Sequence, residues 1–147
     1  MGTDATLVSV IISGFVSAIV AYLTVKFQNR EKKRLFIEQT INEVLNISME
    51  YPLLENDDFC AKWYLRDNCD IDRMRYENYC CRVFNLLERI WFFCGGNMEK
   101  INMIIYVEEW VLQHKIWWQM DIYNIYGYKY DFRVFINGLI SKNGNDS

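Results

Sequence analysis

Residues 70–94 read DIDRMRYENYCCRVFNLLERIWFFC, and this stretch is typical of an amphipathic helix. Its apolar side chains recur with the spacing of one helical face: Tyr79, Cys80, Val83, Phe84, Leu87, Ile90, Trp91 and Cys94. Polar side chains lie opposite: Asn78, Arg82, Asn85 and Arg89. Asp70-Ile71-Asp72 suits the start of a helix, and Gly95-Gly96 suits its end. We therefore expect this helix to supply the core face of a small all-α domain.

Helical patterns continue on both sides of this stretch. We expect a basic helix over about residues 30–49, running on directly from the apolar residues before it because no glycine or proline separates the two. Tyr51-Pro52 should end it, because a residue before proline is disfavoured in a helix. Shorter or later helices are expected at residues 60–65, 98–119 and 132–140. Residues 98–119 are apolar nearly all round, which predicts a central buried helix, with a partner-binding face as the alternative. The fold expected for residues 53–141 is a bundle of about four helices, followed by a disordered tail at 142–147.

A charge-free apolar run precedes this bundle. Residues 5–25 read ATLVSVIISGFVSAIVAYLTV. About 20 apolar residues in a helix span the roughly 30 Å core of a bilayer. A signal peptide would need a basic start and a shorter apolar core, and a buried core helix is rarely uncharged for so long. The run predicts a transmembrane anchor over residues 1–27, with the lipid bilayer as its surroundings.

Basic residues follow the apolar run directly: Lys26, Arg30, Lys32, Lys33 and Arg34. The positive-inside rule places this side in the cytoplasm. The expectation is a single-pass protein of the cell membrane, with its N-terminus outside and its C-terminal domain cytoplasmic. Residues 28–52 would form a juxtamembrane helix whose basic side chains contact anionic lipid headgroups.

Small side chains recur at every fourth position of the apolar run: Ser9, Ser13, Ser17 and Ala21. Such spacing lets two membrane helices approach closely, so it predicts self-association into a homo-oligomer. The alternative is that a membrane helix simply tolerates these serines.

No motif in the chain specifies a reaction. The five cysteines and the single His114 lack the paired short spacings of a zinc site, so no metal or cofactor is expected. A formal net charge of -3 argues against nucleic acid as a partner. Glu108 falls within an apolar arc, and a buried carboxylate needs a partner. We expect an arginine of the preceding helix to pair with it, with a functional carboxylate as the alternative.

A family resemblance rests on residues 76–90, YENYCCRVFNLLERI, followed by Glu109-Trp110 and Trp117-Trp118. The chain resembles an uncharacterised family of bacterial membrane-anchored proteins with a small helical domain. The resemblance implies an architecture and no activity. The hypothesis is a membrane-tethered, non-enzymatic interaction module that docks a cytosolic protein or another copy of itself. The alternatives are a small oligomerising membrane effector or toxin, and a membrane-bound enzyme using Glu108, His114 or a cysteine.

Overall fold

The computed structural model describes the backbone of residues 3–120 and 127–144, and the side chains of residues 12–120 and 127–143. This described part is helical and contains no strand. It divides into two compact units, Met1–Phe36 and Ile37–Ser147. An all-α fold is therefore confirmed.

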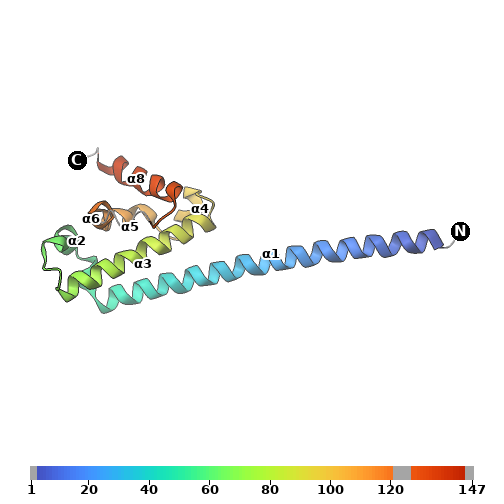
Figure 1. The fold of residues 1–147 in the computed structure, drawn as a ribbon, viewed down its shortest axis with the longest axis horizontal. Coiled ribbons are helices and arrows are strands. Elements are labelled where there is room, and N and C mark those ends of the chain that lie inside the picture. The colour runs from blue at the N-terminus through green and yellow to red at the C-terminus, as the bar shows by residue number, and fades with distance from the viewer. Residues whose placement is uncertain (1–2, 121–126, 145–147) are drawn as a thin grey trace. The chain divides into compact units, whose positions relative to one another are not determined.

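A single helix, α1 (Thr3–Glu50), runs through the boundary between the units (Figure 1). The expected continuity of the apolar run with the basic helix is thus confirmed. The helix ends where Tyr51 precedes Pro52, and Tyr51 takes a non-helical conformation with φ -126° and ψ 74°. Ile37 and Val44 are buried, so the last turns of α1 belong to the core of the second unit.

After α1 the chain forms η1 (Pro52–Glu55), α2 (Asp57–Lys62), η2 (Trp63–Leu65) and α3 (Ile71–Phe93). Asn56 caps α2 by accepting a hydrogen bond from the backbone amide of Phe59. Asp70 caps α3 by accepting bonds from the amides of residues 72 and 73. These caps satisfy amides that have no partner inside their helix. The helix start predicted at Asp70 is confirmed.

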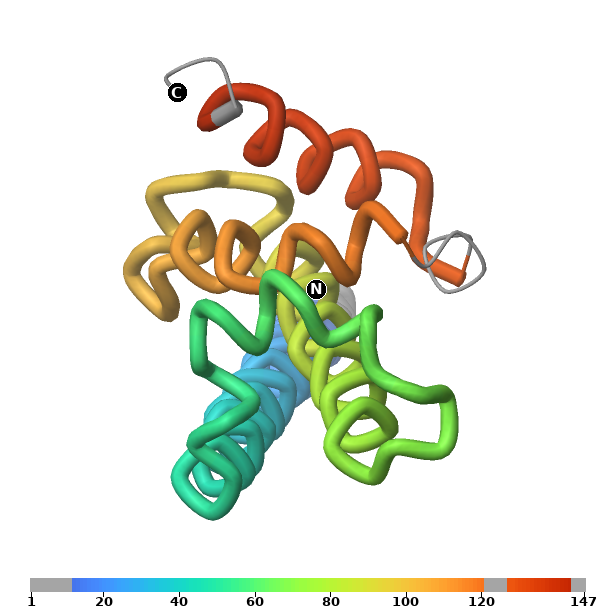
Figure 2. The backbone as a smooth tube through the Cα atoms, turned by 90° about the vertical axis from the view of Figure 1, so that its left-hand side faces the viewer, coloured from blue at the N-terminus to red at the C-terminus, as the bar shows by residue number. Residues whose placement is uncertain are grey.

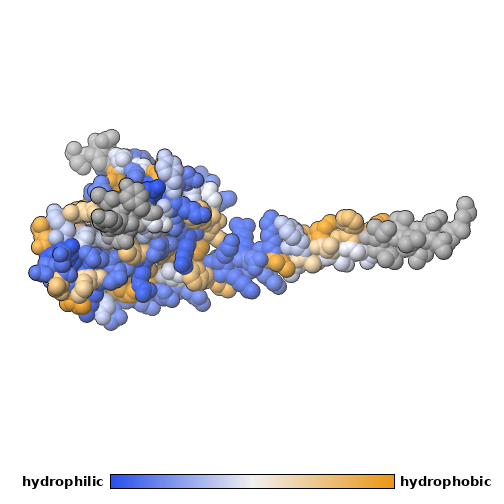
Figure 3. Space-filling model, viewed as in Figure 1, coloured by the Kyte–Doolittle hydropathy of each residue, from blue (hydrophilic) through white to orange (hydrophobic). Residues whose placement is uncertain are grey.

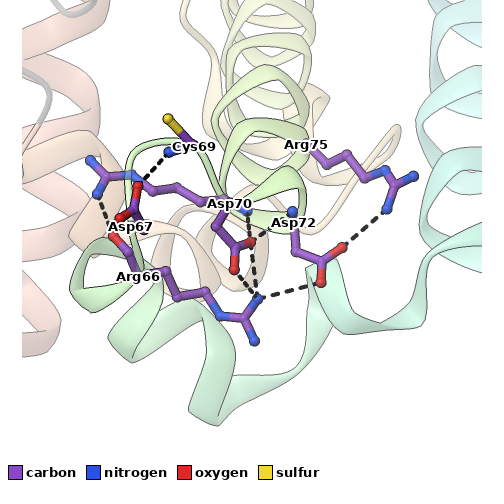
Figure 4. A network of polar contacts seen from close by, with 7 residues as sticks. Arg66, Asp67, Cys69, Asp70, Asp72 and Arg75 are labelled. Carbon is purple, nitrogen blue, oxygen red and sulfur yellow. Dashed lines mark hydrogen bonds and ion pairs between the residues drawn. The ribbon is translucent and has the colours of Figure 1, made fainter.

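A network of exposed ion pairs holds the turn between η2 and α3 (Figure 4). The Arg66 guanidinium lies 3.0 Å from a carboxylate oxygen of Asp70 and 3.4 Å from one of Asp72. Arg75 lies 3.1 Å from the other oxygen of Asp72. Each exposed pair contributes little to stability, about 0–1 kcal/mol, and Asp72 links both arginines into one network across the turn.

Two glycines end α3 in the left-handed region, as predicted. Gly95 has φ 63° and Gly96 has φ 72°. A Cβ atom at Gly96 would also lie 3.2 Å from the ring of Trp91. Only glycine adopts this backbone without strain, and the close approach adds a second reason for it at Gly96.

The single helix expected over residues 98–119 is wrong. The chain forms three short helices instead, α4 (Met98–Asn102), α5 (Val107–Gln113) and α6 (Lys115–Met120). Met103 is 85% exposed and Tyr106 is 73% exposed. Each short helix turns a different apolar group towards the core. The apolar residues of this segment are therefore buried by three differently directed helices and not by one helix covered on every side.

The last helix, α8 (Tyr130–Gly144), is longer than expected. It contains Lys142, so the disordered tail predicted to begin there is wrong for residues 142–144. Residues 121–126, and residues 145–147 of the predicted tail, lie outside the described residues.

The second unit packs in tiers (Figures 1 and 2). Residues 37–50 of α1 lie beside α3, α5 and α6 lie over α3, and α8 covers α5 and α6. The predicted apolar face of α3 is buried except for the half-buried Trp91, and the opposite polar face is exposed. Phe84 of this face meets Trp117 and Trp118 of α6 at ring-centroid distances of 5.3 and 4.6 Å. Aromatic packing therefore joins α3 to the helices above it.

Candidate functional site

His114 lies at the junction of α5 and α6, where its side chain is only 2% exposed. Its Nδ1 atom is 3.0 Å from the hydroxyl of Tyr76 on α3. Its Nε2 atom is 3.4 Å from Oε1 of Glu55, the last residue of η1. The hydroxyl of Tyr79 donates to the same Glu55 oxygen. These four residues, Glu55, Tyr76, Tyr79 and His114, form what we call the His114 cluster.

The pattern of partners assigns the tautomer of His114. An ionised carboxylate can only accept, so Nε2 carries the hydrogen that points to Glu55. In the neutral ring, Nδ1 then accepts the hydroxyl hydrogen of Tyr76. Each buried polar atom of the ring therefore has a partner, which is the condition for burying an imidazole without a large penalty.

The electrostatics of the cluster favour a charged Glu55 and neutral tyrosines. Partial burial raises the pKa of Glu55, but the hydrogen bonds from His114 and Tyr79 outweigh it, and the pKa is lowered below its usual 4.5. Burial raises the pKa of Tyr76 above its normal value. Burial, followed by the bond to Glu55, does the same for Tyr79. The two phenols thus stay protonated and serve as donors.

Two buried thiols lie near the cluster. Burial raises the pKa of both Cys60 and Cys80. The Cys60 thiol donates to the backbone carbonyl of Leu54 at 3.2 Å. The thiolate is the nucleophilic form, so these protonated, engaged thiols suit packing better than catalysis.

A shallow hollow of about 360 Å³ lies beside the cluster. Its wall is formed by Asp57, Cys60, Ala61, Glu109, Leu112, Gln113, Lys115 and Ile116. The Gln113 amide already donates to the backbone carbonyl of Glu55 at 2.9 Å. Within the described residues, no group of three or more acidic, histidine or cysteine side chains is arranged to hold a metal ion. The contacts of Glu55 with Gln113 and His114, and of His114 with Tyr76, tie η1 to α3 and to the end of α5.

We expect Glu55→Gln to lower the free energy of unfolding by about 1–2 kcal/mol at about pH 7, because the charge-assisted bonds from His114 and Tyr79 are lost. The value stays modest because the Glu55 side chain is 40% exposed. A carboxyl whose folded-state pKa is lowered stabilises above its unfolded pKa, and this contribution is lost as the pH falls through the folded pKa. Urea unfolding followed by circular dichroism should show the difference shrinking below about pH 4.

The control for this measurement is Glu43→Gln, at an exposed position on α1. It removes the same charge and should change stability by less than about 0.5 kcal/mol at either pH. A Glu55→Gln effect that stayed constant from neutral to acid pH would contradict the assigned role of the charged carboxylate.

Glu108 does not lie where the sequence predicted. Its side chain is 41% exposed, and its partner is Lys142 of α8, with Nζ 3.8 Å from Oε1. The expected buried carboxylate paired with an arginine is therefore wrong. The reason is the break between α4 and α5. The apolar arc around Glu108 exists only if residues 98–119 form one unbroken helix. Because the Glu108 carboxylate reaches solvent, it does not need a buried cation to offset its charge.

The basic residues expected to contact lipid headgroups all lie exposed on α1: Lys26, Arg30, Lys32, Lys33 and Arg34. Glu31 lies 3.9 Å from Arg34 and is the acidic residue among them. Ser13, Ser17 and Ala21 of the small-residue stripe are exposed as well, and the side chain of Ser9 lies outside the described residues. Headgroup contact and self-association both stay predictions.

The apolar run on α1 is exposed on every side in the part described. Ile12, Phe15, Val16, Ile19, Val20 and Leu23 each keep between 55% and 69% of their surface. Among residues whose side chains the structure describes, no helix contains a segment both long and apolar enough to cross a membrane. The side chains of residues 5–11, which belong to the expected anchor, lie outside that part.

Comparison with known proteins yields no match to a protein-family model, a curated protein or a solved structure. The His114 cluster itself was missed by reasoning from the sequence, which saw His114 only as a lone histidine. Its members come from separate elements. Tyr79 and Glu55 are 24 residues apart in the sequence, and Tyr76 and His114 are 38 apart. Contacts between such distant residues leave no local spacing pattern in the sequence.

Proposed function

We propose that this protein is a membrane-tethered, non-enzymatic interaction module. The observation that carries the proposal is the uncharged run of residues 5–25 at the start of α1, followed at once by five basic residues. Where the structure describes them, the apolar side chains of this run are not covered by the protein. Leaving each large apolar side chain in water costs about 1.5–3 kcal/mol relative to burying it, and a bilayer core removes that cost.

The second unit supplies the part that leaves the membrane. Its polar face on α3 is exposed. The aromatic side chains of Phe84, Trp117, Trp118 and Phe132 are buried in its core, whereas Tyr106 and Tyr130 are exposed. Under the positive-inside rule, the basic residues after the run support a cytoplasmic location for this unit. The buried side chains of His114, Tyr76, Tyr79 and Cys60 are engaged in hydrogen bonds that hold the fold, which favours docking of a cytosolic partner over catalysis.

The test is membrane extraction of full-length protein carrying Val16→Lys and Ile19→Lys. A lysine at the centre of a spanning helix costs about 2.5–3.5 kcal/mol, so two should abolish stable insertion. We expect wild-type protein to stay in the membrane pellet at alkaline pH, and the double variant to move to the supernatant.

The matched control is Met49→Lys, which places the same charge on the same helix at a position that is 70% exposed in the second unit. It should stay in the pellet like the wild type. Release of the wild-type protein by alkaline extraction would refute the tether.

A further inference from the structure

We infer that one face of α1, formed by Lys26, Arg30 and Lys33, binds the phosphate group of an anionic phospholipid. This inference rests on the proposed membrane tether and adds the class of lipid that the tether selects. We call these three residues the basic face.

The basic face follows from the unbroken helix. Because α1 is continuous over residues 3–50, positions 26, 30 and 33 are related as i, i+4 and i+7 and lie on one side. At a rise of 1.5 Å per residue the three cations cover about 10 Å along the axis. Arg34 lies at the edge of this face, 3.9 Å from Glu31.

Lys32 lies on another side of the helix. The residues three and four positions from it are Gln28, Asn29, Leu35 and Phe36, and none of them carries a charge. Lys32 and Lys33 are thus adjacent, equally charged and both exposed, but only Lys33 has basic neighbours on its own face. Substituting each of these two lysines in turn therefore shows whether lipid binding depends on the basic face or only on the total charge of the segment.

The distribution of charge along the chain favours an anionic lipid. The first unit holds five of the 16 basic and two of the 19 acidic residues, a formal charge of +3, which leaves -6 on the second unit. Attraction to an anionic membrane therefore comes from the basic segment, while the second unit is repelled. Figure 3 shows hydrophilic side chains gathered beside the apolar segment of α1.

The position of the basic face defines which phosphate it can reach. It begins directly after the last residue of the apolar run, Val25, and Lys26 and Arg30 lie within the headgroup depth of a spanning helix. The long side chain of Lys33 reaches back towards that depth, because side chains on a helix tilt towards its N-terminus. Two cations one turn apart can contact one phosphate, and such basic residues attract anionic lipid strongly at this depth. A phospholipid headgroup therefore fits the face better than a soluble anion.

The experiment uses full-length protein reconstituted into phosphatidylcholine vesicles that contain spin-labelled phosphatidylglycerol or spin-labelled phosphatidylcholine. Electron paramagnetic resonance reports the fraction of each lipid held at the protein surface, and hence their relative association constants. We expect the wild type to prefer phosphatidylglycerol. Lys33→Gln should reduce this preference about five-fold, and Lys32→Gln less than about two-fold.

Three results would overturn the inference. Equal losses for Lys32→Gln and Lys33→Gln would mean that total charge, and no particular face, attracts the lipid. Equal association of the wild type with both lipids would mean that α1 has no anionic preference. In either case the protein still floats with the vesicles, so the tether stands. Failure to float with vesicles of any composition would refute the tether and the lipid site together.

Discussion

Replacing Trp118 with alanine is expected to lower the free energy of unfolding by about 3–5 kcal/mol, the range for removing a fully buried large aromatic. Trp118 is 1% exposed and packs against Phe84 of α3, Tyr128 and Phe132, with ring-centroid distances between 4.6 and 6.0 Å. Its indole Nε1 also donates to Oδ1 of Asn137 on α8 at 2.9 Å. The loss would leave a cavity between α3 and α8. Chemical denaturation of the full-length protein in detergent, followed by circular dichroism, measures the change.

Met120→Ala is the control for Trp118, two residues further along α6 and 50% exposed. It should cost less than about 1 kcal/mol, because little buried surface is removed. Trp118→Phe separates packing from the hydrogen bond, since it keeps a ring in the core but cannot donate to Asn137. If Trp118→Ala cost no more than Met120→Ala, the packing of α6 between α3 and α8 would be wrong.

His114→Ala is expected to cost about 2–4 kcal/mol. The substitution empties a buried position and leaves the Tyr76 hydroxyl without its acceptor and Glu55 without one of its two donors. A polar group left unpaired in the core carries the full penalty of lost hydration. The same denaturation measurement applies, at about pH 7, where Glu55 is charged.

His114→Phe separates the contribution of the hydrogen bonds to the free energy of unfolding from the contribution of packing. The ring is retained, so the cavity is largely filled, but neither hydrogen bond can form. We expect this variant to remain about 1–3 kcal/mol less stable than the wild type. A His114→Phe protein as stable as the wild type would show that the hydrogen bonds of the His114 cluster contribute nothing net. Lys115→Ala, at the exposed neighbouring position, controls for changes in helix propensity.

Much of the fold could be predicted because its signals are local. The apolar face of α3 repeats every three to four residues, and its capping Asp70 and terminal Gly95 lie within one turn of the helix ends. Proline and glycine restrict their own backbone, and a capping side chain reaches amides two or three residues away. Such effects do not depend on the rest of the chain, so they are visible in the sequence.

The break of residues 98–119 into α4, α5 and α6 could not be predicted in this way. No proline or glycine marks the interruption between Asn102 and Val107. What decides it is which apolar groups find space against α3 and α8. Ile101, Val107, Val111 and Trp117 are all buried, whereas Met103 and Tyr106 between them stay exposed. The prediction for Glu108 was wrong for the same reason. Its position among the apolar side chains assumes one continuous helix, and the helix is interrupted.

The sequence by itself determined the helical class, the continuous α1, the ends of α3 and the uncharged run with its basic flank, because each depends on residues within a few positions of one another. Tertiary structure alone decided the direction of α4–α6, the exposure of Glu108 and the assembly of the His114 cluster. These features require side chains from distant segments to compete for the same core space. The outcome of that competition depends on packing volume and on paired buried hydrogen bonds, and neither quantity can be read from spacing along one helix.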